Sequence, residues 1–300
     1  GNPGTLPQMH PLESTRGLFD FFSKEVLLRQ PEQVRLFMLM TSVFDTFDVS
    51  LCERVLEPLV EGKHFDWPVL FETVRTGNLF SVPLDNEGRW MRYHHLFQHF
   101  LRSQLQYEQP VLAWHIEQNL AHAYEEQQAW EEALEMYARL DDYENQVRLL
   151  IQTGMNFIFA GRVLTLANLL DKLPSNVVYS QPALVSLLGI VHATRGHTLQ
   201  ALEFYDLAES GLRNTGNNIE WMVTLVRRAE AYRQLGQFDR ALQDIEQTLE
   251  LTKETTLTDL QSIYAEAQRI KGLTLFGLGN MKEALVWLQD ALRTCRKMGI

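Results

Sequence analysis

The sequence predicts a mainly α-helical protein in which a winged helix-turn-helix module, residues 17–108, leads into a right-handed superhelix of helical repeats, residues 109–300. Two observations predict this fold class. Stretches in the second part share one internal spacing, which is typical of stacked repeats. In the first part, helical apolar patterns surround two short apolar runs joined by turn-forming residues. Residues 1–16 form a separate N-terminal segment.

Composition excludes several classes of protein. The chain has 300 residues, 45% of them hydrophobic and 22% charged, which is ordinary for a globular protein of about two domains. Its net charge of −11 argues against nucleic-acid binding, since phosphate neutralisation needs clustered Lys and Arg. The apolar run near 36–40 is too short to cross a bilayer, so no membrane partner is predicted. Cys52 and Cys295 are the only cysteines, and we expect free thiols in a reducing, cytoplasmic compartment.

The winged-helix module begins with helical patterns. Apolar residues at helical spacing predict a helix over 17–29, and Pro31 fits the start of the next one. Ser50-Leu51-Cys52-Glu53 has the pattern of a capping box and predicts that another helix starts there. A further helix is predicted over Trp67–Arg75. These helices would form the body of the module.

A β-hairpin and a closing helix complete the module. The runs 79–84 and 89–93 flank Asp85-Asn86-Glu87-Gly88, which predicts two strands around a tight turn. Pro83 lacks an N–H, so its strand lies at an edge or ends there. A helix is predicted over 94–102. Winged helices often bind DNA, but the candidate recognition helix 67–75 offers only Arg75 as a basic residue, so we interpret the module as a packing domain.

The second part repeats a two-helix unit. Its corners at Gly196, Gly236 and Gly279 are 40 and 43 residues apart, and each is followed five residues later by an Ala-Leu pair. A unit at 120–140 has Gln128 at the corner, and 156–173 is degenerate. Glycine suits a corner that needs positive φ. The units resemble tetratricopeptide repeats, whose usual period is about 34 residues. Such arrays present a curved surface, which indicates recognition rather than bond chemistry.

The hairpin region carries a second resemblance. The run 78–97, ending in Phe100-Leu101-Arg102, resembles the signature that follows the nucleotide-binding domain of MalT-like regulators, and 36–43 also resembles theirs. Members of this family are signal-transducing ATPases that often end in a LuxR-type DNA-binding domain. The phosphate-binding loop G-x-x-x-x-G-K-[ST] is absent here. We therefore interpret the chain as a piece of a longer protein, expect no cofactor and no enzymatic activity in it, and expect ATP or ADP in the full-length protein.

The same resemblance points to one cofactor-binding residue. In related regulatory ATPases, a Met-His-Asp-Leu motif places its histidine on the phosphate of bound ADP. Tyr93-His94-His95-Leu96 is similar, so His94 is the candidate, although His95 replaces the aspartate. The alternative is that His94 caps or packs the start of its helix. His95 and His99 are spaced to share a metal, but nothing nearby completes a set of three or four ligands, so no metal site is predicted.

Binding residues are expected on the concave face of the repeats. Neither a G-x-S-x-G elbow nor an H-E-x-x-H motif occurs, so no catalytic residue is predicted. First-helix positions that point away from the packing residues would line an effector groove, with ordinary exposed helix residues as the alternative. By spacing, these positions are His115, Gln118, His122, Glu125, Ser186, Thr194, Glu230, Arg233, Glu266, Arg269 and Phe276. Their mixed chemistry suits a small-molecule inducer or a regulatory protein.

The resemblance implies sensing and relay within a MalT-like transcriptional regulator. The repeats would bind the effector, and the winged helix would couple that event to the nucleotide state and self-association of the full-length protein. Such a switch works through the differential affinity of the effector for two states. The alternative is a constitutive scaffold whose repeats hold partner proteins without switching.

Overall fold

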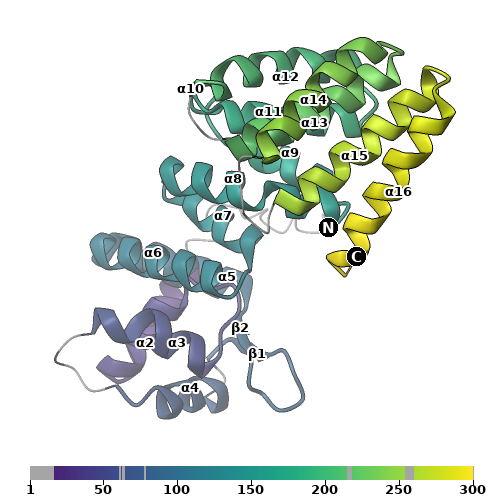
Figure 1. Ribbon diagram of the computed structural model, residues 1–300. Helices are drawn as coiled ribbons and strands as arrows, with labels where there is room; N and C mark the ends of the chain where they lie inside the picture. The colour runs from purple at the N-terminus through teal and green to yellow at the C-terminus, as the bar shows by residue number, and fades with distance from the viewer. Residues whose placement is uncertain are drawn as a thin grey trace, which may run out of the picture. The chain divides into compact units, whose positions relative to one another are not determined.

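The computed structural model describes residues 17–60, 62, 65–77, 79–214, 218–253 and 260–299, with the side chain of residue 253 excepted. The predicted N-terminal segment 1–16 and Asn78 lie outside the described residues. The chain divides between Asp141 and Asp142 into two compact units. Figure 1 shows helices throughout and one small hairpin, so the predicted mainly helical fold with a two-stranded wing followed by helical repeats is confirmed.

The first unit begins with the helices of the winged-helix module. They are the π-helix η1 (Phe22–Leu27), α2 (Glu32–Thr41), α3 (Val49–Leu56), the 3₁₀ turn η2 (Glu57–Leu59) and α4 (Trp67–Thr76). The capping box predicted at Ser50 is wrong, because α3 starts earlier. Asp48 is its N-cap and accepts a hydrogen bond from the Leu51 amide at 2.7 Å. Asp48 lies two residues before Ser50 in an extended conformation, and its carboxylate accepts a free amide hydrogen at the start of the helix in place of the Ser50 hydroxyl.

The wing is an antiparallel pair of short strands, β1 (Ser81–Pro83) and β2 (Met91–Tyr93). Pro83 ends its strand, as predicted, and pairs with Met91. The hairpin is joined to the helices because Phe47 exchanges two backbone hydrogen bonds of 2.9 Å with Met91. Tyr93 is buried, and its hydroxyl contacts Thr41 Oγ1 at 2.8 Å. Strand β2 is therefore part of the core of this unit, whereas β1 lies at its surface.

Three further helices complete the first unit: α5 (His95–Glu108), α6 (Pro110–Glu126) and α7 (Trp130–Arg139). The amide of Gln98 donates to the carbonyl oxygens of Ser42 and Phe44, which attaches α5 to the turn after α2. Asn119 Nδ2 donates to the Val55 carbonyl at 3.0 Å and attaches α6 to α3. The change of sequence pattern at 108/109 thus lies between α5 and α6, inside one compact unit.

The second unit is an array of helices that pack on their neighbours in the chain. They are α8 (Tyr143–Phe159), α9 (Val163–Asp171), α10 (Ser175–Ser180), α11 (Pro182–Thr194), α12 (Thr198–Leu212), α13 (Asn218–Gln234), α14 (Phe238–Lys253), α15 (Leu260–Gly277) and α16 (Met281–Lys297). The helices pair as α11/α12, α13/α14 and α15/α16, and successive pairs stack (Figure 1). Stacking buries the apolar face that a single pair would leave exposed.

The predicted corners are confirmed. Gly196, Gly236 and Gly279 have φ of +81°, +72° and +83°, in the left-handed region that a Cβ disfavours. In the first-unit repeat, Gln128 occupies the same conformation with φ of +58°. The corner between paired helices is therefore a backbone requirement, which glycine meets at lower cost.

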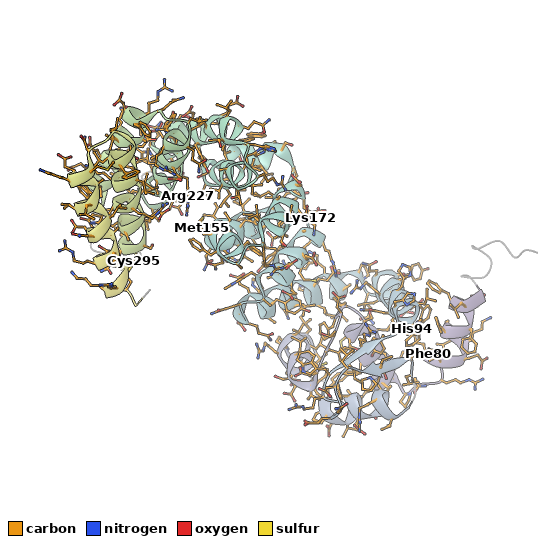
Figure 2. The ribbon with its side chains drawn as sticks, turned by 90° about the vertical axis from the view of Figure 1, so that its right-hand side faces the viewer. Phe80, His94, Met155, Lys172, Arg227 and Cys295 are labelled. Carbon is orange, nitrogen blue, oxygen red and sulfur yellow. The ribbon has the colours of Figure 1, made fainter. Side chains whose placement is uncertain are left out.

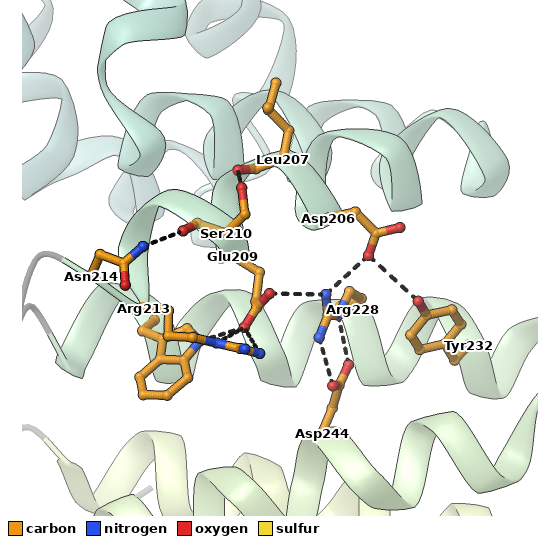
Figure 3. A network of polar contacts seen from close by, with 10 residues as sticks. Asp206, Leu207, Glu209, Ser210, Arg213, Asn214, Arg228, Tyr232 and Asp244 are labelled. Atoms are coloured by element: carbon orange, nitrogen blue, oxygen red, sulfur yellow. Dashed lines mark hydrogen bonds and ion pairs between the residues drawn. The ribbon is translucent and has the colours of Figure 1, made fainter.

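A buried arginine holds three successive helices of the array together (Figure 3). Arg228 on α13 donates two hydrogen bonds of 2.8 Å to Asp244 on α14 and one of 2.9 Å to Asp206 on α12. Glu209 lies 3.8 Å away, and it also accepts from Arg213. Burial lowers the pKa of Arg228, but the hydrogen bonds and attraction of Asp244 outweigh it and hold that pKa above its ordinary value. This arginine network attaches α13 to α12 and α14.

Candidate functional site

The second unit contains a pocket of about 730 Å³, a volume typical of small-molecule sites. It is lined by residues of α8, α13, α15 and α16, and Figure 2 labels Met155, Arg227 and Cys295 around it. The lining residues are Met155, Phe159, Val223, Val226, Arg227, Ser262, Ile263, Ala265, Glu266, Arg269, Leu288, Ala291, Leu292, Cys295 and Met298. The pocket thus lies between α8, from the degenerate stretch of the array, and helices of the last two repeats.

Most of the pocket wall is apolar, and part of it is open to water. Phe159 on α8 is 76% exposed, and Leu292 on α16 is 51% exposed. Ile263 on α15 adds a half-buried branched side chain to the lining. A contiguous apolar surface left open to water costs free energy, and on a folded protein it marks a place where something binds.

One side of the pocket is charged. Arg269 donates two hydrogen bonds of 2.9 Å to Glu266, both from α15. Arg227 on α13 approaches the same carboxylate at 3.7 Å. The hydrogen bonds from Arg269 lower the pKa of Glu266 against the opposing effect of burial. Two arginines and one glutamate leave this side with one net positive charge.

The charged side continues along α13. Glu230 accepts hydrogen bonds of 2.9 and 2.6 Å from Arg233. Burial raises the pKa of Glu230, but the hydrogen bonds from Arg233 and the attraction of Arg233 and Arg269 hold it below its ordinary value. Arg227, Glu230 and Arg233 recur every three residues and so share one helix face. We call these three with Glu266 and Arg269 the charge ladder.

The residues predicted for the groove are only partly brought together. Glu266 and Arg269 line the pocket, and Glu230 and Arg233 adjoin it through the charge ladder. Thr194 and Phe276 are exposed near the ends of α11 and α15 but outside the lining.

One prediction for the groove is corrected. Ser186 is 5% exposed, and its hydroxyl contacts Thr224 Oγ1 at 2.8 Å between α11 and α13. It is a packing residue rather than a groove residue. The reason is that the face of α11 that carries Ser186 is covered by the next repeat, and a single repeat's pattern does not show this.

The predicted residues of α6 belong to the first unit. Gln118 is half-buried. The Tyr137 hydroxyl donates to Glu125 at 3.0 Å and lies 3.2 Å from His122 Nδ1. His115 lines a second pocket of about 630 Å³ with residues of η2 and of the α5–α6 junction. The structure thus divides the predicted groove between the two units.

Several pocket residues were missed by sequence reasoning. Met155 and Phe159 are apolar, so their pattern on α8 is indistinguishable from core packing. Cys295 stood out only by its rarity. Arg227 had a usable signal, since it continues the three-residue spacing of Glu230 and Arg233 toward the start of α13. Its neighbour Arg228 points to a different side of α13, into the arginine network.

His94 occupies the N-cap position of α5 and is exposed (Figure 2). Its side chain makes no capping hydrogen bond, and its ring centroid lies 4.6 Å from that of His95. The backbone amide of His94 donates to the Phe80 carbonyl at 2.7 Å, which fixes the residue at the end of the hairpin. Within the described residues, no three His, Cys, Asp or Glu side chains gather as a metal site.

Family comparisons match both parts of the chain. Residues 23–113 match the MalT winged helix domain, and residues 118–145 and 222–297 match tetratricopeptide repeats. In the part of the chain that the structure describes, no helix has the length and apolar character needed to cross a membrane.

Relatives with these features are much longer proteins. The HTH-type transcriptional regulator MalT of Vibrio parahaemolyticus is 26% identical over 284 residues, and that of Vibrio campbellii is 25% identical over 284 residues. Each alignment covers 93% of this chain and 30% of the relative, so the chain spans about a third of their length.

A solved structure shares the fold. The signal transduction ATPase with numerous domains (STAND) protein with a tetratricopeptide repeat sensor from Pyrococcus horikoshii superposes with a TM-score of 0.67 at 16% identity. The match covers 94% of this chain and 41% of that one. The family matches and the curated relatives, rather than this likeness of fold, show a MalT-type winged-helix domain followed by tetratricopeptide repeats, which makes the chain a MalT-like segment.

Proposed function

We propose that this chain is the sensing and relay segment of a MalT-like, ATP-dependent transcriptional regulator, and that the pocket in its second unit binds a small-molecule effector. The observation that carries this proposal is the pocket itself, which combines a ligand-sized volume, an open apolar wall and a charged side. The relatives named as transcriptional regulators support the regulatory context.

The position of the pocket explains how binding is relayed. Its walls come from α8 and from two later repeats, so a bound ligand contacts helices that are distant in the sequence. A ligand that contacts all of these helices at once stabilises the arrangement in which they lie close enough together to bind it. An effector shifts a two-state equilibrium by its difference in affinity for the two states. Tightening of the repeats is thus the signal passed to the rest of the regulator.

The rival function is a constitutive scaffold for protein partners. A scaffold needs exposed surface but no ligand-sized pocket with an internally paired charge ladder, so the pocket favours the sensor. The two functions also differ in outcome. A sensor changes the output of the regulator when the pocket is altered, whereas a scaffold loses partners whether or not an effector is present.

A reporter assay with the intact regulator tests the proposal. Ile263→Asp places a charge in the apolar wall of the pocket, and we expect it to abolish induction of a target promoter. Gln261→Asp, an exposed site on the same helix and outside the lining, is the matched control and retains induction. Circular dichroism of both variants establishes that they are folded. Induction by the Ile263→Asp protein at the wild-type level would show that the pocket does not bind the effector.

We also infer a nucleotide role for His94 in the intact protein. An exposed imidazole at a helix N-cap, free of a capping hydrogen bond, is available to meet an ADP phosphate presented by the nucleotide-binding domain. We expect His94→Ala to speed ADP release from the intact regulator, and His99→Ala, on the same helix, to leave it unchanged. Equal release rates from wild type and His94→Ala would leave His94 as an exposed helix-start residue only.

A further inference from the structure

We infer that the ligand of this pocket is a small organic anion with a large apolar body, bound with its anionic group on Arg227. This inference deepens the proposed function and rests on it. It comes from three features of the lining: the extent of the apolar wall, the scarcity of neutral polar groups, and the charge left unbalanced on α13.

The apolar wall sets the body of the ligand. Met155, Phe159, Ile263, Leu288 and Leu292 line the same pocket from three helices. Covering such side chains removes apolar area from water and so stabilises a complex. An alkyl or aromatic body that fills the pocket is stabilised in this way over its whole surface.

The same wall argues against a ligand rich in hydroxyl groups. Within the described lining, Ser262 supplies the only neutral hydroxyl, and no Asn, Gln or Tyr side chain takes part. A polar group moved from water into an apolar site without a hydrogen-bond partner loses its hydration without compensation, which weakens binding. Most hydroxyl groups of such a ligand would lack a hydrogen-bond partner in this pocket.

Arg227 sets the anionic end. Arg269 donates two hydrogen bonds to Glu266. Arg227 approaches that carboxylate only to 3.7 Å, which is beyond hydrogen-bond distance. The Arg227 side chain is 27% exposed, and its guanidinium is the positive charge that the Arg269–Glu266 pair leaves over in the pocket. Guanidinium groups match carboxylates, sulfonates and phosphates through paired N–H donors. A ligand anion that docks here completes the pairing.

Cys295 makes occupancy of the pocket measurable. Its thiol lies in the lining on α16 and is half-buried. The only other thiol, Cys52, is fully buried in the first unit, and burial raises its pKa well above the ordinary value. Iodoacetamide therefore alkylates Cys295 in the folded chain and spares Cys52. A ligand in the pocket slows the alkylation of Cys295.

Two matched dyes test the inference on the 300-residue chain. The anion 1-anilinonaphthalene-8-sulfonate and the uncharged N-phenyl-1-naphthylamine share an aromatic body and differ in the sulfonate. We expect both to fluoresce in the pocket and to slow alkylation of Cys295. The anion binds about tenfold more tightly, since a charge-assisted hydrogen bond is worth about one factor of ten or more in affinity.

Variants assign the difference to one side chain. Arg227→Met keeps the apolar stem and removes the charge, so we expect it to weaken binding of the sulfonate about tenfold and leave the uncharged dye unchanged. Arg293→Met, on α16 outside the lining, is the control and changes neither affinity. If Arg227→Met does not fold, the ratio of the two affinities in the wild-type chain still shows whether the pocket prefers an anionic ligand.

The outcomes separate this inference from the proposed function. Equal affinity of the two dyes, with Cys295 protected by both, would overturn the anionic ligand and leave the pocket as an effector site. A sulfonate preference that survives in Arg227→Met would overturn the role of Arg227. If neither dye protects Cys295, the pocket does not take apolar ligands and the proposed function fails with it.

Discussion

Removing the charge of Arg228 is the strongest test of how the repeat array is held together. Arg228→Met retains the stem and packing of the side chain but deletes the guanidinium. Arg228 is 12% exposed and Asp244 6% exposed, so the deletion leaves the Asp244 carboxylate buried without its partner. Breaking a buried ion pair in this way costs about 3–5 kcal/mol.

The magnitude is set almost entirely by Asp244. The other two carboxylates near Arg228 keep compensation, since Asp206 is largely exposed to water and Glu209 still accepts hydrogen bonds from Arg213 and Trp221. For a unit of this size, 3–5 kcal/mol lowers the melting temperature by roughly 6–20 °C. Hydrogen exchange of α12–α14, measured by mass spectrometry, reports this unit separately from the first.

Two comparisons make the result interpretable. Arg293→Met removes an arginine that is 68% exposed and pairs with Asp290 on the same helix, and it should cost less than about 1 kcal/mol. Arg228→Met combined with Asp244→Leu removes both buried charges and should recover most of the loss. If Arg228→Met costs no more than Arg293→Met, or if the double variant is no more stable than the single one, the buried pair does not hold the array.

Three further predictions concern acid, packing and ligands. Arg269 lowers the pKa of Glu266, so the stability from this pair is complete above the ordinary glutamate pKa of about 4.3 and is lost as the pH falls through the lower folded value. The difference in stability between wild type and Glu266→Gln should therefore shrink on acidification. A difference that stays constant with pH would refute this prediction. Ala241→Leu overpacks a fully buried site by about 1–3 kcal/mol and should melt lower than Glu230→Ala, which should alter only signalling in the intact regulator; a reversed order contradicts the groove assignment. The 300-residue chain should show neither micromolar ATP binding by calorimetry nor sequence-dependent DNA retention in gel shifts, since it carries no phosphate-binding loop and Arg75, the basic residue of α4, is paired with Glu72 at 2.7 Å.

Local physics explains what was correctly predicted from sequence. A corner that needs positive φ selects glycine whatever surrounds it, which is why Gly196, Gly236 and Gly279 marked the repeats. The hairpin over 81–93 followed from a turn between apolar runs. Where two local signals competed, the choice failed: Asp48, rather than Ser50, caps α3, because both residue types can accept the free amides.

The sequence by itself determined the fold class and the corners, since each depends on spacing within one or two elements. Tertiary structure alone decided which faces are covered. Ser186 has the chemistry of a groove residue but lies under the next repeat, whereas Phe159 has the chemistry of a core residue but lies open in the pocket. Burial depends on the neighbours of a helix rather than on its own pattern. The pocket needs α8 beside α15 and α16, and that proximity exists only once the array has stacked.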